Sequence, residues 1–372
     1  MKILHVITSI NRGGAENHLI ELARLQKEAG HMVAVAYLKG NHYWKEKFYS
    51  DGVLTFDLGL NFYGDIQPLY RLWKTFNQFK PDFVHVHLPP AELYTWFFLL
   101  ISRSRLPLLI SKHNDEPFYR GLFAGFLATC VAKRAYHIIA ISYAVKNFLC
   151  YQNSIVPEDK TSIVYYGINT MPYQNVLRSK VNELRLLWGV ENHELLFGVV
   201  ARFVPQKSLN TLLDGFSYFV CRANIKSKLV LVGEGPLHQN LEDQAKKLKI
   251  SDRVIFSGFR EDIPIVMNCL DVFVLTSIYE GFGLVLLEAM AASRPIVASR
   301  VSAIPEIVEH EKTGLLFPTR DTEALGHCLL KLQDSELRNM YGYEGFHRSQ
   351  RFFSLNTMLN ETKTIMKFSI ND

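Results

Sequence analysis

Short apolar runs alternate with amphipathic stretches along the first half of the chain. The apolar runs have strand length and predict strands at residues 2–8, 32–38, 83–87, 108–112 and 137–142. Apolar residues at helical spacing predict helices at residues 16–30, 68–79 and 91–102. This alternation predicts a parallel sheet covered by helices, whose ligands bind beyond the carboxyl ends of the strands.

A second series of the same kind begins near residue 195. It predicts strands at residues 196–200, 228–232, 254–257, 272–276 and 295–298, and a helix at residues 209–221. The stretch at residues 165–192 is more polar and has no strand pattern, so we place a boundary within residues 165–180. The pattern therefore predicts two α/β domains, residues 1–170 and residues 171–353.

Composition supports two domains of a globular protein. The chain has 372 residues, of which 48% are hydrophobic and 21% are charged. The apolar run at residues 96–101 is far shorter than the roughly 20 residues that cross a bilayer, and residues 3–7 predict a strand rather than a signal peptide. The five cysteines form no C-x-x-C pair, which argues against disulfide or zinc frameworks and favours the cytoplasm.

Positive charge is concentrated in the first half. Residues 1–170 hold 18 Lys and Arg against 13 Asp and Glu, whereas residues 171–372 hold 23 of each kind. Such an excess favours an anionic membrane surface or an anionic substrate, although an ordinary solvated face explains it equally well. Nucleic-acid binding is not supported, because the chain has no recognised module and no dense Lys/Arg patch.

The most informative motif holds two glutamates, Glu280 and Glu288, on either side of Gly281 and Gly283. A predicted strand precedes the motif and a predicted helix contains its second half. Backbone N–H groups at a helix N-terminus attract anions, and glycine lets a ligand approach the backbone closely. A carboxylate beside an anion needs hydrogen-bond donors, which sugar hydroxyls supply. The motif therefore predicts a site for a phosphorylated sugar.

Other candidate residues follow predicted strands. Arg202 and Lys207 suit a diphosphate, although alone they could be ordinary surface cations. Gly14 opens the first predicted helix but belongs to no G-x-G-x-x-G fingerprint, and a plain turn explains it equally well. His113 follows a strand and is placed to hydrogen-bond a sugar hydroxyl or stabilise developing charge.

Metal binding is not expected. His85 and His87 alternate on one strand and point the same way, but a metal site needs three or four converging ligands, so a structural role is the default for His85. The chain contains no Asp-x-Asp pair to hold a divalent metal on a nucleotide diphosphate. Fixed cations and helix dipoles would then stabilise the leaving diphosphate without a cofactor.

Taken in order, these motifs resemble the retaining glycosyltransferases of family 4, the glycosyl transferases of group 1. The resemblance runs nearly end to end. It is carried by the motifs at residues 3–16, 81–87, 140–142, 164–169, 202–207, 233–236, 258–260, 280–288, 305–306 and 313–316. It implies the GT-B fold, in which two Rossmann-like parallel-sheet domains face each other across a cleft. It also implies that residues 354–372 cross back onto the N-terminal domain.

The resemblance implies a role for each site residue. Glu288 would bind the ribose, and Glu280 would bind the donor sugar. His113 would act at the reacting centre and Gly14 would lie against the donor. The other donor-binding residues would hold the diphosphate, its sugar or the base: Arg202, Lys207, Gly233, Arg260, Gly281, Phe282, Gly283 and Leu284. Ser293 and the pair Ala303-Ile304 depart from the family, which often has glycine there.

The implied reaction moves a hexosyl or N-acetylhexosaminyl group from a nucleotide diphosphate sugar, with UDP favoured, to an acceptor hydroxyl with retention of configuration. The expected acceptor is a saccharide or a lipid-linked saccharide in polysaccharide, lipopolysaccharide or glycolipid synthesis. We expect a cytoplasmic protein, at the inner membrane face if the basic domain and the aromatic-rich segments at residues 93–101 and 118–126 contact lipid. A nucleotide-sugar epimerase or hydrolase of the same fold, or a non-catalytic binding subunit, is the alternative.

Overall fold

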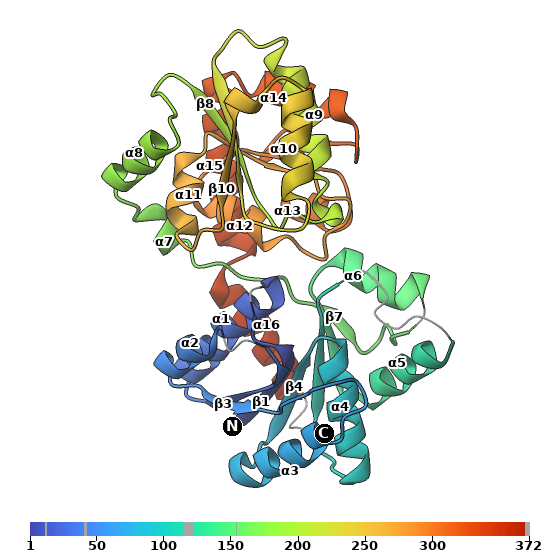
Figure 1. The fold of residues 1–372 in the computed structure, drawn as a ribbon. Helices are drawn as coiled ribbons and strands as arrows, with labels where there is room; N and C mark the ends of the chain where they lie inside the picture. Colours follow the sequence, from blue (N-terminus) through green and yellow to red (C-terminus); the bar gives the residue numbers. More distant parts are fainter. Residues whose placement is uncertain (12, 41–42, 115–121, 154, 369–372) are drawn as a thin grey trace. The chain divides into compact units, whose positions relative to one another are not determined.

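The computed structural model describes residues 1–372 apart from residues 12, 41–42, 115–121, 154 and 369–372. The chain forms two compact units. The first holds Met1–Gly167 and Leu355–Asp372, and the second holds Ile168–Ser354 (Figure 1). Each unit has its own parallel sheet with helices against it, which is the Rossmann-like architecture expected of the GT-B fold.

The first unit is built on a seven-stranded sheet in the order β3-β2-β1-β4-β5-β6-β7, with every described pair parallel. Its strands are β1 (Lys2–Ser9), β2 (Met32–Lys39), β3 (Leu54–Asp57), β4 (Phe83–His87), β5 (Leu108–Lys112), β6 (His137–Ala140) and β7 (Thr161–Ile163). The central strands are buried along most of their length, which is why they read as continuous apolar runs. The strand order reverses between β1 and β4.

The helices of the first unit are α1 (Gly14–Glu28), α2 (Lys45–Ser50), α3 (Gln67–Phe79), α4 (Pro89–Ile101), α5 (Leu122–Arg134), α6 (Tyr143–Asn147), the π-helix η1 (Phe148–Gln152) and α16 (Leu355–Phe368). Although α16 ends the chain, it lies beside α1 (Figure 1). Its buried Met358 and Leu359 join Ile3 and Phe83 in one hydrophobic cluster, so the last helix completes the core of the first unit.

The second unit is built on a six-stranded sheet in the order β10-β9-β8-β11-β12-β13, again with every described pair parallel. Its strands are β8 (Leu195–Val200), β9 (Ser227–Val232), β10 (Val254–Gly258), β11 (Val272–Leu275), β12 (Ile296–Ser299) and β13 (Gly314–Phe317). The strand order reverses between β8 and β11. Ligands of open α/β sheets bind beyond the carboxyl ends of the strands at such a point.

The helices of the second unit are α7 (Met171–Gln174), α8 (Arg178–Leu187), the 3₁₀ turns η2 (Pro205–Lys207) and η3 (Ser251–Arg253), α9 (Leu209–Val220), α10 (His238–Lys247), α11 (Ile263–Cys269), α12 (Leu284–Ala291), α13 (Ile304–Ile307), α14 (Thr322–Lys331) and α15 (Ser335–Phe352). Phe197, Phe216 and Phe219 lie at the centre of its core, where their ring centroids are 4.9 to 6.0 Å apart. In the part of the chain that the structure describes, no helix combines the length and the apolar character of a membrane span.

Candidate active site

Two loops are tied together where the strand order of the second unit reverses. The Ile278 backbone N–H donates to the carbonyl of Gln206 at 2.9 Å, and the Gln206 side-chain amide donates to the carbonyl of Tyr279 at 3.0 Å. The Thr276 hydroxyl lies 2.8 Å from the carbonyl of Lys207 and donates to it. The loop after β8 and the loop after β11 therefore form one unit that carries Lys207 and Glu280 at the carboxyl edge of the sheet.

Lys207 and Glu280 form an ion pair with each other. Glu280 Oε1 also accepts a hydrogen bond from the Ser277 hydroxyl at 2.7 Å, and only 7% of Glu280 is exposed. A cation and a carboxylate that are expected to bind opposite ends of a sugar phosphate are thus paired and nearly buried. Breaking such a pair leaves an uncompensated buried charge, so an incoming anion at Lys207 must be matched by donors at Glu280.

The helix α12 begins directly after this pair. Gly283 precedes its first residue with φ +93°, a left-handed conformation that favours glycine. Phe282 is 2% exposed and its ring lies 6.0 Å from that of Phe353, so this side chain packs in the core and only its backbone remains for a ligand. Ala303 donates its backbone N–H to the Glu280 carbonyl at 3.3 Å and has a fully buried side chain.

Glu288 lies in α12 and is half-buried. Removal of its carboxyl group from water raises its pKa to about 7, although a hydrogen bond with Tyr173 works in the opposite direction. Tyr173 comes from α7 and is itself buried. A carboxyl group that changes charge near neutral pH therefore lies in the helix that follows the Lys207–Glu280 pair.

The remaining predicted residues of the second unit differ in their surroundings. Arg202 is exposed, and the described part of the chain offers its guanidinium no ion pair or hydrogen bond. Arg260 is engaged by Asp262 through two hydrogen bonds of 2.8 and 2.6 Å, and this carboxylate raises the pKa of Arg260. Gly233 has φ +135°, and an added Cβ would lie 2.0 Å from the carbonyl oxygen of Ala201. Packing therefore explains Gly233, while Arg202 is free to bind an anion.

Gly14 begins α1 in the first unit. A Cβ added at Gly14 would meet no atom within 4 Å, whereas one added at Gly13 would lie 2.3 Å from Glu16 Oε2. Gly14 also lacks the positive φ that would favour glycine. Neither packing nor backbone conformation within this unit explains Gly14, and close approach of a ligand remains a sufficient reason for it.

His113 follows β5, is 7% exposed, and uses both ring nitrogens. Its Nδ1 lies 2.5 Å from the Tyr166 hydroxyl and its Nε2 lies 3.1 Å from Nδ1 of His87. Desolvation, with a smaller contribution from Lys112, lowers the pKa of His113 to about 3, so the ring is neutral at physiological pH. The ring would have to exchange one of these partners to bind a sugar hydroxyl.

Three residues of these sites were not predicted from sequence: Tyr166, Tyr173 and His5. Tyr166 belongs to the motif at residues 164–169, and its hydroxyl hydrogen-bonds His113. That motif was the sequence signal for Tyr166. Tyr173 comes from a short helix with no apolar periodicity. His85 and His87 share a face as predicted, and His5 lies opposite His85 in the register of β1 and β4. A histidine in each of two adjacent central strands was the available signal.

Comparison with known families covers most of the chain. Residues 12–171 match the model described as Glycosyltransferase Family 4, and residues 184–348 match the model described as Glycosyl transferases group 1. An uncharacterized glycosyltransferase of Methanocaldococcus jannaschii is 35% identical over 184 residues, which is 48% of this chain and 46% of that protein. This chain therefore spans about half the length of that relative.

Two further similarities extend over more of the chain. The UDP-Gal:alpha-D-GlcNAc-diphosphoundecaprenol alpha-1,3-galactosyltransferase of Escherichia coli is 24% identical over 284 residues, 74% of this chain and 72% of that protein. The crystal structure of Anabaena HepE in complex with UDP and glucose superposes with a TM-score of 0.86 at 23% identity, covering 99% of each chain. The chain therefore belongs to the family 4 glycosyltransferases, and it is a transferase enzyme with the GT-B fold.

Proposed function

We propose that this protein transfers a hexosyl or N-acetylhexosaminyl group from a UDP-sugar to a hydroxyl of a saccharide or lipid-linked saccharide, with retention of configuration. The observation that carries the proposal is the nearly buried Lys207–Glu280 pair on the joined loops of β8 and β11. UDP is favoured because the Anabaena structure contains UDP and because the Escherichia coli relative is named for a UDP-Gal donor.

The donor would reorganise this pair. A diphosphate at Lys207 takes over the interaction of the ammonium group, and Arg202 adds an exposed guanidinium that can bind two oxygens. Glu280 then accepts hydrogen bonds from sugar hydroxyls in place of Lys207. Glu288, when ionised, accepts hydrogen bonds from the ribose. Arg260 is already engaged by Asp262 and so would contribute to the donor site through the shape of its loop.

The proposed mechanism follows from the hydrogen bonds that the carboxylate of Glu280 makes. Glu280 is held by Lys207 and Ser277 and serves as a hydrogen-bond acceptor, so we assign no nucleophile. The acceptor oxygen attacks the anomeric carbon on the face that the phosphate leaves. The bond between that carbon and the phosphate oxygen breaks, and the departing phosphate takes the hydroxyl proton of the acceptor. Lys207 and Arg202 stabilise the developing charge, so no metal is required in this proposal.

Charge variants test the donor assignment. Lys207→Ala is expected to reduce transfer from a UDP-sugar by about 100-fold or more, because it removes a fixed cation beside the leaving diphosphate. Lys312→Ala is the matched control, since Lys312 pairs with Glu309 on an exposed surface. Circular dichroism would establish that both variants are folded. Near-normal turnover in folded Lys207→Ala would overturn the assignment.

Product analysis tests the reaction itself. UDP-, GDP- and ADP-sugars are first compared by thermal shift, since a bound donor stabilises the folded state. The stabilising donor is then incubated with and without a saccharide or lipid-linked acceptor. Release of UDP with a new glycosidic bond of retained configuration supports the proposal. Release of free sugar at the same rate without acceptor indicates the hydrolase instead.

The first unit carries an exposed aromatic surface that suits a membrane-associated acceptor. Exposed large hydrophobic residues gather in and just before α3: Phe62, Tyr63, Ile66, Tyr70 and Trp73. Lys39 lies over the ring of Tyr63 at 5.1 Å, and Lys74 lies over that of Tyr70 at 4.8 Å. Aromatic rings with adjacent cations suit the interface of an anionic bilayer. We propose that this surface contacts the membrane when the acceptor is lipid-linked.

The two aromatic-rich segments at residues 93–101 and 118–126 differ in how much of each the structure describes. In α4, Phe97, Leu100 and Ile101 are exposed, whereas Phe98 and Leu99 pack in the core. Phe98 contacts Phe76 of α3, with ring centroids 4.6 Å apart, so α4 adjoins the aromatic surface. Phe126 of α5 is exposed, and residues 118–121 lie outside the described part of the chain.

Vesicle binding tests the surface. The protein is expected to co-sediment with phosphatidylglycerol vesicles at low salt, and Trp73→Ser combined with Tyr70→Ser should weaken this binding. Leu187→Ser removes an even more exposed apolar residue from the second unit and should leave binding unchanged. Absence of binding at low salt, or an equal loss in the Leu187 variant, would contradict the assignment.

A further inference from the structure

The first unit has a group of buried histidines between its sheet and α1. His5, His85 and His87 are fully buried, and His18 and His113 are nearly so. Burial in an apolar core disfavours the charged form, which lowers the pKa of His5 to about 4 and the pKa values of His85 and His87 well below the ordinary value. The rings are therefore neutral. Buried polar groups cost free energy unless they are partnered, so the partners of each nitrogen matter.

Three of these rings converge. His5 and His85 face each other in the register of β1 and β4, and His87 follows on the same face. The ring centroids are 5.1 Å apart for His5 and His85, 5.3 Å for His5 and His87, and 4.2 Å for His85 and His87. One nitrogen from each ring lies within 4.8 Å of the other two.

The outer nitrogen of each ring has its own partner. His5 Nε2 lies 2.7 Å from Gln26 Oε1, and His85 Nε2 lies 2.8 Å from the Ser111 hydroxyl. His87 Nδ1 lies 3.1 Å from Nε2 of His113. The three inner nitrogens are then His5 Nδ1, His85 Nδ1 and His87 Nε2. Metal-binding histidines have this arrangement, in which a second partner fixes the tautomer and the ring orientation.

The inner nitrogens do not satisfy one another. His5 Nδ1 and His87 Nε2 share one hydrogen bond of 3.1 Å, but His85 Nδ1 is buried with no hydrogen-bond partner among the described residues. His18 Nδ1 is also buried with no hydrogen-bond partner among the described residues, and the His18 ring centroid lies 6.3 Å from that of His87. An unpaired buried nitrogen in a group of three converging imidazoles points to a missing ligand.

We propose that His5, His85 and His87 bind one Zn²⁺ ion through Nδ1, Nδ1 and Nε2, respectively. Neutral imidazoles suit zinc and related transition metals, whereas Mg²⁺ and Ca²⁺ prefer oxygen ligands. Tetrahedral zinc at about 2.0–2.1 Å from nitrogen places its ligand nitrogens about 3.3 Å apart. The 3.1 Å separation of His5 and His87 is already close to that value.

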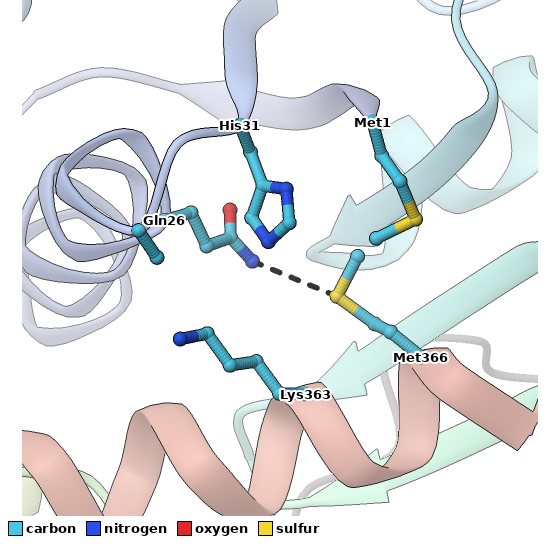
Figure 2. Close-up of a pocket in the computed structure, with 6 residues that line it drawn as sticks. Met1, Gln26, His31, Lys363 and Met366 are labelled. Carbon is cyan, nitrogen blue, oxygen red and sulfur yellow. Dashed lines mark hydrogen bonds between the residues drawn. The ribbon is translucent and has the colours of Figure 1, made fainter.

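A surface pocket of this unit reaches Gln26, the hydrogen-bond partner of His5. A cavity of about 240 Å³ is lined by Met1, Gln26, Ala29, His31, Lys363 and Met366. Figure 2 shows the Gln26 amide between α1 and α16, with its Nε2 3.8 Å from the sulfur of Met366. The Oε1 of the same amide accepts from His5. The same side chain therefore lines the cavity and holds His5.

Zinc would also change the tautomer of His113. Without the ion, His5 carries its proton on Nε2 and donates it to Gln26, which leaves His5 Nδ1 as an acceptor. His87 then donates from Nε2 to His5 Nδ1. His87 Nδ1 in turn accepts a hydrogen bond from His113 Nε2. With zinc on His87 Nε2, its proton moves to Nδ1 and is donated to His113 Nε2. The proton of His113 then lies on Nδ1, facing Tyr166. Any effect on transfer rests on the proposed function, whereas metal binding does not.

Metal binding by the full chain without a histidine tag is the direct test. The protein is unfolded in EDTA, refolded with Zn²⁺ or Co²⁺ and dialysed, because the site is enclosed. We expect one equivalent of metal per chain, a rise in melting temperature, and the visible bands of tetrahedral Co²⁺ coordinated by nitrogen. UDP binding by the second unit, measured separately, reports on folding and on the donor site.

Variants locate the ion. His85→Gln should lose the bound equivalent, and Gln26→Met should weaken binding by about 10- to 100-fold, because it removes the amide oxygen that orients the His5 ring. His137→Gln is the control, because His137 lies on β6 of the same sheet and hydrogen-bonds Ser162 outside the cluster. If His85→Gln does not fold, metal binding by Gln26→Met tests the proposal. Folded wild-type protein without metal, or binding that is unchanged in both variants, overturns the proposal.

Discussion

At the residue scale, the proposed role of Glu288 predicts that donor binding depends on pH. Burial raises its pKa from 4.5 to about 7, so the folded state favours the protonated form. The free energy of unfolding should therefore fall as pH rises from 4.5 through 7, because the unfolded chain ionises this group first. The ionised carboxylate is the stronger acceptor for ribose hydroxyls, so UDP affinity should rise over the same range up to pH 8.

Glu288→Gln separates the two effects. It should gain about 1–3 kcal/mol of stability relative to wild type at pH 8 and little at pH 4.5, while UDP affinity becomes weak and independent of pH. Denaturant unfolding and calorimetric UDP titration at several pH values measure these quantities. Glu361→Gln on α16 is the control and should leave UDP affinity unchanged. An unaltered pH profile of UDP affinity in Glu288→Gln would exclude Glu288 as the titrating group.

Gly14 and Gly233 make a matched pair of glycines with different requirements. An added Cβ at Gly14 meets open space, so Gly14→Ala should fold with normal stability but reduce donor affinity. An added Cβ at Gly233 lies 2.0 Å from a backbone oxygen in a left-handed conformation, so Gly233→Ala should be strongly destabilised. Thermal unfolding and UDP-sugar titration distinguish them. Unimpaired donor binding by Gly14→Ala would remove Gly14 from the predicted site.

Individual residues show what sequence could and could not predict. The loop positions of Lys207 and Glu280 follow from the strands that precede them, so their neighbourhood was predictable. Their ion pair was not, because it depends on how two loops dock. Tyr173 reaches Glu288 from a separate short helix, and His5 meets His85 through strand register. Such pairings are set by tertiary structure and leave no local pattern.

At the element scale, the strands missed from sequence lie at the edges of the two sheets. β3 (Leu54–Asp57) and β7 (Thr161–Ile163) have four and three residues and are only partly buried, so their apolar signal is weak. β13 (Gly314–Phe317) is buried but has only four residues, and the helices α14 and α15 were missed as well. The central strands were predicted because both faces are buried. Ser293, where the family often has glycine, follows the C-cap residue of α12 and has φ +55°. That left-handed conformation explains why glycine is common at this position.

The joined loops of β8 and β11 also lead to a prediction. The Thr276 hydroxyl is buried and lies 2.8 Å from the carbonyl of Lys207 and 3.1 Å from that of Ser208, whose φ is +46°. Thr276→Val should lower stability by about 1–3 kcal/mol and weaken donor binding about tenfold, because the turn that carries Lys207 loses its anchor. Chemical unfolding and donor titration measure both.

Thr362→Val provides the control for that measurement. Thr362 is equally buried, but its hydroxyl donates within α16 to the carbonyl of Met358. This variant should leave donor affinity unchanged. Equal donor affinities in the Thr276 variant and in wild type would show that the two loops are not held together by this hydroxyl.

At the scale of the whole molecule, two Rossmann-like sheets were predictable because alternating strands and helices repeat in both halves. The place of α16 in the first unit followed only from the family resemblance, since it depends on packing between residues far apart in sequence. Met358 and Leu359 fill a cluster that contains Ile3 and Phe83. Residues at the two ends of the chain thus share one core.

This division of the chain leads to a last prediction. The core cluster of the second unit lies entirely within Ile168–Ser354, as do Arg202, Lys207, Glu280 and Glu288. A fragment of these residues should therefore fold alone, because it keeps its sheet and its core. It should bind UDP with an affinity within a few-fold of the full chain, while transfer is lost with Gly14 and His113. Calorimetry on the two proteins compares the affinities. A folded fragment that does not bind UDP would show that the nucleotide site requires the first unit.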